Sequence, residues 1–219
     1  MVTTQAKPFE MHWDPQTTAC ISIDFQRDFM EAGGFGETLG NDVSTLREAI
    51  EPTKELFGAL RKAGVLMIHT REGHRPDLGD LHPAKRDRGN PSLRIGDQGP
   101  MGRILVRGEY GHDIIDELKA LEGEIVLDKP GKDSFYGTDL DVILKAHNIK
   151  TLIIIGVTTE VCVQSTARAA NDRGYECMIV EDCTASYFPE FKQAALEMFA
   201  AQGAIVGWVA NSKDVIASL

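Results

Sequence analysis

The chain has 219 residues, a formal net charge of −10 at pH 7 and a sequence pI near 5.1. Hydrophobic residues make up 42% and charged residues 26% of it, ordinary globular values that exclude extensive disorder. This length fits one α/β domain over residues 1–219 and is short for two. The acidic balance disfavours nucleic acid and anionic membrane surfaces as partners.

The expected location is the cytoplasm. No apolar stretch approaches the length of a membrane span, and the N-terminal stretch MVTTQAKPFEMHW lacks the continuous apolar core of a signal peptide. The four cysteines have neither CxxC spacing nor the density of a secreted disulfide scaffold. Cys20 and Cys177 fall in strand-like runs and are interpreted as packing residues, as is Cys183, although Cys183 could also line a site.

Apolar runs with strand character alternate with helical patterns along the chain. Strands are expected over residues 20–25, 65–70, 124–128, 151–156, 177–182 and 204–209. Helices are expected over residues 46–62, 113–118, 140–147, 162–173, 191–202 and 213–218. Three glycines follow helices where a left-handed C-cap is wanted, namely Gly64, Gly174 and Gly203. Strict alternation predicts a single-domain α/β fold with a doubly wound, mostly parallel six-stranded sheet and helices on both faces.

One long segment interrupts this alternation. Residues 71–108 are rich in Gly, Pro and charge and show no convincing period. Loops of this length inside a compact domain are usually functional or disordered. Because the segment leaves the carboxyl end of the second strand, we interpret it as a lid or an intersubunit arm.

The segment IIIGVTTEVCVQS runs from an apolar strand through a glycine into a turn and places Cys162 at the start of a helix. Unpaired N–H groups and the positive end of the dipole at a helix N-terminus lower the pKa of a thiol and make it nucleophilic. A free cysteine is equally compatible with a buried packing role.

Two other strand ends carry groups that complement a thiol. Asp24 ends the run TACISIDF, and Lys129 follows the apolar run in EIVLDKPGKDSF. The site of an open parallel sheet lies outside the carboxyl ends of its strands, so Asp24, Lys129 and Cys162 can converge. Read singly, Asp24 is as compatible with a cap or turn and Lys129 with a solvated surface charge. Together they suit attack on an amide, with Asp24 carrying the proton and Lys129 favouring the thiolate.

These residues resemble the isochorismatase-like cysteine hydrolases, a family that includes nicotinamidases and N-carbamoylsarcosine amidases. The resemblance rests on the Asp of ISIDFQRDF, the Lys of DKPGKDSF and the Cys of GVTTEVCV, in that order, and extends over nearly the whole chain. HTREGHRPDL, DKPGKDSF and ANDRGYEC are most similar to the biuret and triuret hydrolases. The resemblance implies a catalytic Asp24, Lys129 and Cys162, a homotetramer, and a cis peptide between Val157 and Thr158. It also implies that the N–H groups of Thr158 and Cys162 bind the developing oxyanion.

No metal or other cofactor is expected. Some nicotinamidases of the family hold a metal with an Asp two residues before a His, but Met67 occupies that place before His69. The spacing of His69, His74 and His82 matches no compact metal motif, so these are interpreted as hydrogen-bonding loop residues.

Further residues are candidates for binding substrate. Lys132 and Arg71 lie near strand ends and could donate to substrate carbonyls, although a solvated cation is an equal interpretation for each and the favoured one for Arg75. Four aromatics could form a pocket wall, although aromatics beside strands are more often core: Phe35, Tyr136, Tyr187 and Phe188.

The predicted activity is metal-independent hydrolysis of a terminal carboxamide of a small neutral linear ureide, triuret or biuret, with release of ammonia through an acyl enzyme. The nearest alternative is a ureidoacrylate or N-carbamoyl amino acid amidohydrolase, whose anionic substrate needs a dedicated arginine. Isochorismatase-type vinyl-ether hydrolysis needs no cysteine, so Cys162 argues against it. A non-catalytic ligand-binding protein on the same fold is the alternative from another class.

Overall fold

The computed structural model describes residues 1–88 and 93–219. Its centre is a six-stranded sheet in the order β10-β9-β8-β3-β4-β7, in which every adjacent pair is parallel. The strands are β3 (Thr18–Ile23), β4 (Leu66–Glu72), β7 (Ile125–Lys129), β8 (Thr151–Val157), β9 (Glu176–Ala185) and β10 (Trp208–Ala210). The predicted fold class, a parallel six-stranded α/β sheet, is confirmed.

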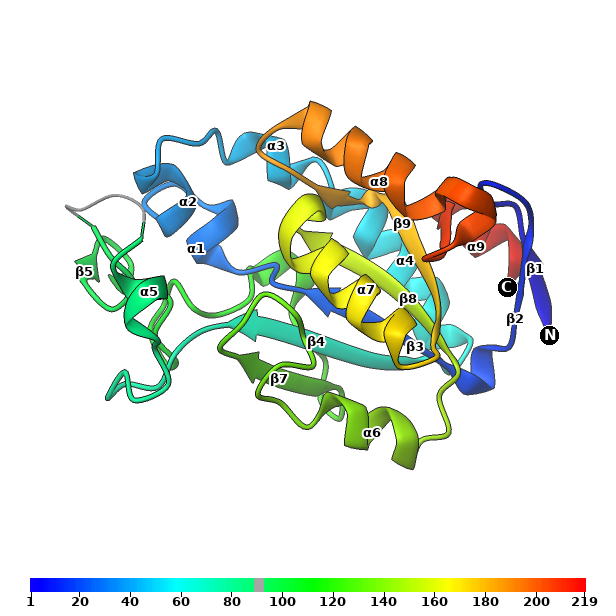
Figure 1. Ribbon diagram of the computed structural model, residues 1–219, viewed down its shortest axis with the longest axis horizontal. Coiled ribbons are helices and arrows are strands. Elements are labelled where there is room, and N and C mark those ends of the chain that lie inside the picture. The colour runs from blue at the N-terminus through cyan, green and yellow to red at the C-terminus, as the bar shows by residue number, and fades with distance from the viewer. Residues whose placement is uncertain (89–92) are drawn as a thin grey trace.

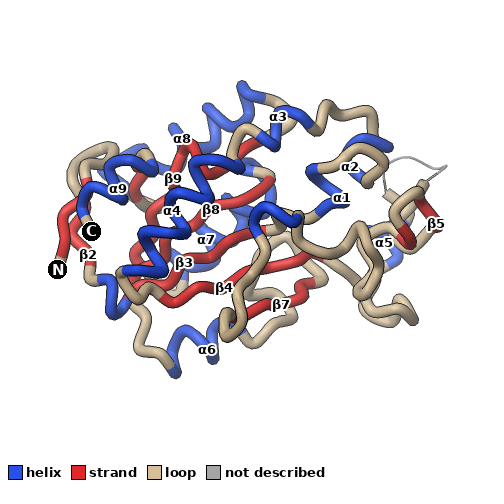
Figure 2. The backbone as a smooth tube through the Cα atoms, turned by 180° about the vertical axis from the view of Figure 1, so that it is seen from behind, coloured by secondary structure: helices blue, strands red, loops and turns tan. Residues whose placement is uncertain are grey.

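Helices cover both faces of this sheet (Figures 1 and 2). One face carries α4 (Ile50–Lys62) and α9 (Ser212–Ser218), and the other carries α6 (Leu140–Ala146), α7 (Gln164–Asp172) and α8 (Pro189–Ala204). Alternate strand residues enter two separate cores: Cys20 packs in the core beneath α4, whereas its neighbour Ile21 packs in the core beneath α7. Burial on both faces explains why the strands read as continuous apolar runs rather than alternating ones.

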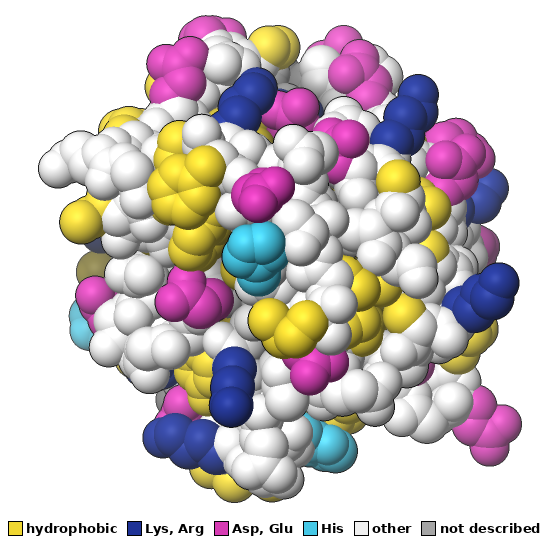
Figure 3. Space-filling model, turned by 90° about the vertical axis from the view of Figure 1, so that its right-hand side faces the viewer, with side chains coloured by type: hydrophobic (Ala, Val, Ile, Leu, Met, Phe, Trp, Pro, Cys, Tyr) yellow, Lys and Arg dark blue, Asp and Glu magenta, His cyan; other side chains and the backbone are white. Residues whose placement is uncertain are grey.

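The parallel sheet gives the molecule two distinct ends. At the carboxyl ends of the strands lie α1 (Arg27–Met30), α2 (Phe35–Thr38) and α5 (Pro83–Arg86), whereas both chain termini and the hairpin of β1 (Val2–Thr4) and β2 (Met11–Trp13) lie at the opposite end (Figure 1). Seen from the end that carries the termini, acidic side chains are spread over the surface among neutral ones (Figure 3).

Several expected boundaries are corrected by the structure. The helix expected over 46–62 is divided into α3 (Ser44–Arg47) and α4, and the one expected over 113–118 is only the 3-10 turn η2 (Asp116–Leu118). The strand expected over 204–209 begins late, because Gln202, Gly203 and Ala204 all adopt positive φ and turn the chain first. The predicted left-handed caps at Gly64, Gly174 and Gly203 are confirmed.

The segment 71–108 has more structure than its sequence indicates. It contains the end of β4, α5 and the two-stranded pairing of β5 (Gln98–Gly99) with β6 (Gly102–Arg103). Ile95, Ile104 and Leu105 form a small buried core of their own, against which Phe35 of α2 packs. We refer to this segment as the arm; residues 89–92 of it lie outside the described part.

Within residues 1–88 and 93–219, each helix is too short or too polar to cross a lipid bilayer.

Candidate active site

Asp24, Lys129 and Cys162 converge at the carboxyl ends of β3, β7 and β8, as the sequence predicts. The Nζ atom of Lys129 lies 2.7 Å from Oδ2 of Asp24. Ligand atoms of Asp24, Cys162 and a third residue, Glu72, all lie within 4.8 Å of one another. All four residues are buried. Positions far apart in the chain therefore form one closed cluster of charged groups around a thiol.

Asp24 follows the last residue of β3 and has a φ of +53°. This left-handed conformation is uncommon for a non-glycine residue and is held in place by two contacts with β4. The Asp24 N–H donates to the carbonyl of Thr70 at 3.1 Å, and the Thr70 hydroxyl donates to Oδ1 of Asp24 at 2.7 Å. The strained turn thus directs the carboxylate towards Lys129.

Lys129 is the last residue of β7, and its ammonium donates to the carbonyl of Gly131 at 2.9 Å. Burial acts to lower the pKa of Lys129, but the Asp24 carboxylate and the neighbouring Cys162 and Glu72 outweigh burial and raise the pKa above its usual value. Lys129 therefore stays charged inside the protein.

Cys162 lies in the single π-helical turn η3 (Thr159–Val163), which leads directly into α7. The peptide between Val157 and Thr158 just before this turn is cis, as the resemblance implies. The expected lowering of the thiol pKa is wrong for this closed site. Burial raises the pKa of Cys162 well above its usual value; Lys129 and Lys132 act against this, while Asp24 and Glu72 add to it. The helix-start argument failed because it left out both burial and a second carboxylate.

Glu72 is the functional candidate that sequence reasoning missed. The Cys162 thiol donates to Oε2 of Glu72 at 3.6 Å. The other oxygen, Oε1, lies 2.6 Å from Nζ of Lys132 and 2.7 Å from Nζ of Lys85, a residue of α5 in the arm. Period-two alternation from Thr70 at the carboxyl end of β4 places Glu72 on the same face as Asp24, and this was the available signal.

The backbone of Glu72 is held as firmly as its side chain. Its N–H donates to Oε1 of Gln26 at 2.6 Å, and Nε2 of Gln26 donates back to its carbonyl at 3.0 Å. Burial acts to raise the pKa of Glu72, but Lys132, Lys129 and Lys85 outweigh burial and hold the pKa below its usual range. Glu72 is therefore a fixed carboxylate beside the thiol.

Of the predicted substrate-binding cations, the structure brings Lys132 into the cluster but not Arg71. Arg71 alternates with Thr70 and Glu72 along β4, so its side chain is on the opposite face of the sheet. There Nε of Arg71 donates to Asp128 at 2.8 Å and Nη1 donates to Asp113 at 3.0 Å. Arg75 is exposed and pairs with Asp77, which agrees with its interpretation as a surface charge.

The four predicted aromatic wall residues have other contacts. Phe35 packs on the core of the arm, and the Tyr187 hydroxyl donates to the carbonyl of Phe29 at 2.7 Å. Phe188 packs against Phe191 with ring centroids 5.0 Å apart. Tyr136 is 67% exposed. For all four residues the pocket wall stays a prediction.

The residues do not fit a resident metal. Met67 packs in the core beneath α4, and Nε2 of His69 lies 2.9 Å from Glu124, so His69 is a buried strand residue rather than the loop residue expected. His74 contacts Asp80 and Lys85, and His82 caps α5. The carboxylates of Asp24 and Glu72 are already paired with the ammonium groups of Lys129 and Lys132, against which a metal ion would have to compete.

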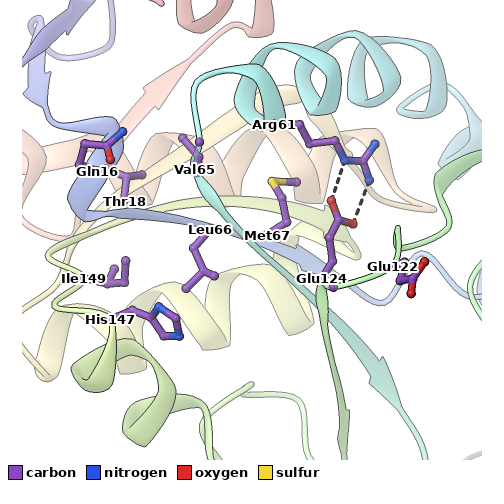
Figure 4. A pocket seen from close by; sticks show the side chains of 12 residues that line it. Gln16, Thr18, Arg61, Val65, Leu66, Met67, Glu122, Glu124, His147 and Ile149 are labelled. Atoms are coloured by element: carbon purple, nitrogen blue, oxygen red, sulfur yellow. Dashed lines mark hydrogen bonds and ion pairs between the residues drawn. The ribbon is translucent and has the colours of Figure 1, made fainter.

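A separate cavity of about 440 Å³ lies at the opposite end of the sheet (Figure 4). Arg61 lies on one side of it and is bonded to Glu124 through Nε at 2.7 Å and through Nη2 at 3.0 Å. Other polar side chains also line this cavity, namely Gln16, Thr18, Glu122 and His147.

The doubly wound fold and the buried cluster at its strand ends are features of a hydrolase that works through a side-chain nucleophile. Residues 18–211 match the protein-family model of the isochorismatase domain. The chain belongs to the isochorismatase family of hydrolases.

Solved structures support this assignment over most of the chain. A cysteine hydrolase from Pseudomonas syringae pv. phaseolicola is 26% identical, with a TM-score of 0.80 and coverage of 94% of this chain and 95% of that one. An N-carbamoylsarcosine amidase from Thermoplasma acidophilum is 25% identical, with a TM-score of 0.67 and coverage of 90% and 96%. A nicotinamidase from Bacillus subtilis is 26% identical, with a TM-score of 0.68 and coverage of 89% and 99%.

Proposed function

We propose that the protein is a metal-independent cysteine amidohydrolase that releases ammonia from a linear ureide, triuret or biuret. The observation that carries the proposal is the convergence of the Cys162 thiol with the Asp24–Lys129 ion pair in one buried cluster. Similar solved structures include proteins named as N-carbamoylsarcosine amidase and nicotinamidase, both of which cleave amide bonds, and this supports amide chemistry here.

In the acylation step, the Cys162 thiol proton passes to Asp24 and the sulfur forms a bond to the terminal carboxamide carbon. Lys129 stabilises the anionic cluster during this transfer. The carbon–nitrogen bond then breaks, and the leaving nitrogen takes the proton from Asp24 and departs as ammonia. The acyl group remains on the sulfur.

In the deacylation step, Asp24 takes a proton from a water molecule as its oxygen attacks the acyl carbon. The carbon–sulfur bond breaks, and the proton returns from Asp24 to the thiolate. The product is an N-carboxylated ureide, which in the triuret case loses carbon dioxide without enzymatic help. We assign the N–H groups of Thr158 and Cys162 to the oxyanion in both steps, because Thr158 directly precedes the turn that carries the sulfur and Cys162 lies within it.

The cluster favours a ureide over the alternatives on chemical grounds. A linear ureide is neutral and carries both carbonyl acceptors and N–H donors, which match the ammonium groups of Lys129 and Lys132 and the carboxylate of Glu72. Ureidoacrylate or an N-carbamoyl amino acid needs an arginine for its carboxylate, and Arg71 is engaged on the other face of the sheet. A non-catalytic binding protein has no need for a thiol beside a buried ion pair.

Ammonia release from a panel of small substrates tests the proposal directly. We expect the highest kcat/KM for triuret or biuret, with analogues lacking the carbonyls rejected by about a thousandfold or more, because buried donors would be left unpaired. If nicotinamide, ureidoacrylate or N-carbamoylsarcosine is turned over faster than both ureides, the substrate assignment is wrong.

We also propose that the protein acts in the cytoplasm as a homo-oligomer, a tetramer. The arm extends from the carboxyl end of the sheet and offers surface for such contacts (Figure 2). Sedimentation at working concentration is the measurement, and a fully active monomer would contradict the assembly.

A further inference from the structure

We infer that Glu72 is a substrate-recognition residue, which selects neutral, N–H-rich acyl substrates and excludes anionic ones from the thiol. This inference rests on the proposed function and deepens it. Within the described residues, the Cys162 thiol donates a hydrogen bond to Glu72 alone, with the sulfur 3.6 Å from Oε2. A substrate group that the sulfur attacks therefore lies beside a carboxylate oxygen.

The two oxygens of Glu72 face different surroundings. Oε1 contacts the ammonium groups of Lys132 and Lys85 at 2.6 and 2.7 Å. Oε2 faces the sulfur, with the ammonium of Lys129 at 3.9 Å. An ionised carboxylate only accepts hydrogen bonds. Oε2 can therefore receive an N–H from a substrate amide, whereas a substrate carboxylate placed there has no donor to offer.

The charges of the cluster lead to the same conclusion. Three ammonium groups face two carboxylates, and transfer of the thiol proton to Asp24 leaves this balance of charges unchanged. Each ammonium already contacts a carboxylate: Lys129 contacts Asp24, whereas Lys132 and Lys85 contact Glu72. A substrate carboxylate placed beside the sulfur therefore meets the carboxylate of Glu72 and finds each ammonium group already paired, and the two like charges repel.

Glu72 is suited to recognition rather than to carrying the proton. It lies beside three ammonium groups, whereas Asp24 contacts one, and the lysines hold the pKa of Glu72 below its usual range. A carboxylate held so strongly in its charged form is a poor proton acceptor. Proton transfer is left to Asp24, and Glu72 stays charged throughout the reaction.

The position of Glu72 is fixed from two directions. Gln26 contacts both its N–H and its carbonyl, and Lys85 reaches its side chain from the arm while also donating to the carbonyl of Pro130 at 2.7 Å. A pre-positioned acceptor is what discrimination between substrates of similar size requires.

Alkylation of Cys162 by iodoacetamide and iodoacetate provides the test. In both reactions the thiolate displaces iodide, and the reagents differ in whether they carry an amide or a carboxylate. Rates are measured by mass mapping of the peptide that contains Cys162, with 2-mercaptoethanol as the reference thiol. The quantity compared is the ratio of the iodoacetamide rate to the iodoacetate rate. We expect this ratio to be at least about tenfold higher for Cys162 of the wild-type protein than for the reference thiol, because the carboxylate of iodoacetate is repelled by the carboxylate of Glu72.

Glu72→Gln keeps the shape of the side chain and removes its charge. We expect this variant to lose most of the extra preference, by about fivefold or more. Glu124→Gln, which removes a paired carboxylate at the other end of the sheet, is the matched control and should keep the wild-type preference. In hydrolysis, Glu72→Gln should lose more kcat/KM with a neutral ureide than with an anionic ureido acid.

A wild-type ratio equal to that of the reference thiol overturns the inference, as does an unchanged ratio in folded Glu72→Gln. If Glu72→Gln does not fold, the wild-type ratio alone decides. Failure of the proposed function has a separate signature: no ammonia is released from any ureide, while the alkylation preference stands.

Discussion

Two clusters of ionisable side chains lie towards opposite ends of the same strands. At the carboxyl ends of β4 and β7, Glu72 and Lys129 belong to a set of three ammonium groups, two carboxylates and a thiol. At the amino ends, His69 of β4 and Glu124, the residue just before β7, form a smaller set with Arg61. Ion pairing is common to both ends, so it does not by itself mark a catalytic site; at the amino ends Arg61 and Glu124 are only partly buried, whereas Asp24, Glu72 and Lys129 are fully buried.

The two clusters differ in the backbone conformation of the residues that form them. At the carboxyl end, Asp24 has a φ of +53°, Gly156 has a φ of +124°, and the pairing of β8 with β9 shifts register between Ile154 and Gly156. At the amino end, Arg61 and His69 come from a regular helix and a regular strand. The positive φ of Asp24 belongs to a residue of the cluster, whereas at the amino end a non-glycine residue with positive φ, Asn148, lies outside the set of Arg61, Glu124 and His69.

The largest expected effect is that of replacing the thiol. Cys162→Ser should lower kcat/KM by at least about a thousandfold, because the hydroxyl is a far weaker nucleophile at neutral pH. Cys183→Ala removes a buried thiol from the core on the other face and should keep activity. Ammonia release by both folded variants is the measurement. Substantial activity in Cys162→Ser would show that Cys162 is not the nucleophile.

We expect the cation of the carboxyl-end cluster to support catalysis and that of the amino-end cluster to support stability. Lys129→Gln should lower kcat/KM by about a hundredfold, because the thiolate and Asp24 lose their shared ammonium group. Arg61→Gln removes a cation that pairs with Glu124 and should reduce stability with less than about a threefold change in kcat/KM. Similar losses of turnover in the two variants would contradict the division between the ends.

Two glycines with positive φ, one at each end of the sheet, allow the two ends to be compared by the unfolding free energy that an alanine costs. A Cβ at Gly156 would collide with the backbone of Ile23, so Gly156→Ala should cost about 3 kcal/mol of unfolding free energy. Gly174, after α7, has open space around it, and Gly174→Ala should cost about 1 kcal/mol from its conformation alone. Urea unfolding of both variants measures the difference, and equal costs would mean that the strands separate readily.

Buried histidines should make stability fall in mild acid. Burial lowers the pKa of His112 from 6.5 to about 4, opposed by the nearby Asp128. The unfolded chain takes up the proton first, so this contribution is complete above pH 6.5 and declines as the pH falls from 6.5 towards 4. We expect a loss of about 1 to 2 kcal/mol between pH 7 and 5, smaller in His112→Gln, measured as urea midpoints. A flat profile would contradict this.

The smallest expected effect is that of chelation. Prolonged EDTA treatment should leave kcat/KM unchanged, because ammonium groups already neutralise the only described trio of possible ligands, Asp24, Glu72 and Cys162. Loss of activity that one added divalent metal restores would show instead that a metal ion takes the place of a lysine.

The sequence predicted the parallel sheet and the meeting of Asp24, Lys129 and Cys162, because alternation of strands and helices makes the strands parallel and the carboxyl ends of parallel strands share one edge. It did not reveal Glu72 and Lys85, whose roles depend on which face of β4 each residue occupies and on where the arm folds. Arg71 was assigned to the site by its nearness to a strand end, yet one residue of alternation places it on the opposite face. The predicted lowering of the Cys162 pKa was wrong for a related reason, because a local sequence motif does not show how deeply the thiol is buried.

The alternation in β4 also limits how this site can change through mutation. Substitutions at Thr70 or Glu72 alter the surroundings of the reacting sulfur one group at a time, whereas substitutions at Arg71 act on the far face. Inserting one residue within the strand before Arg71 would move Arg71 into the place of Glu72 and replace the carboxylate beside the thiol with a guanidinium group. New specificities within this chain are therefore reached by point substitution in β4, whereas changes of length are confined to the arm.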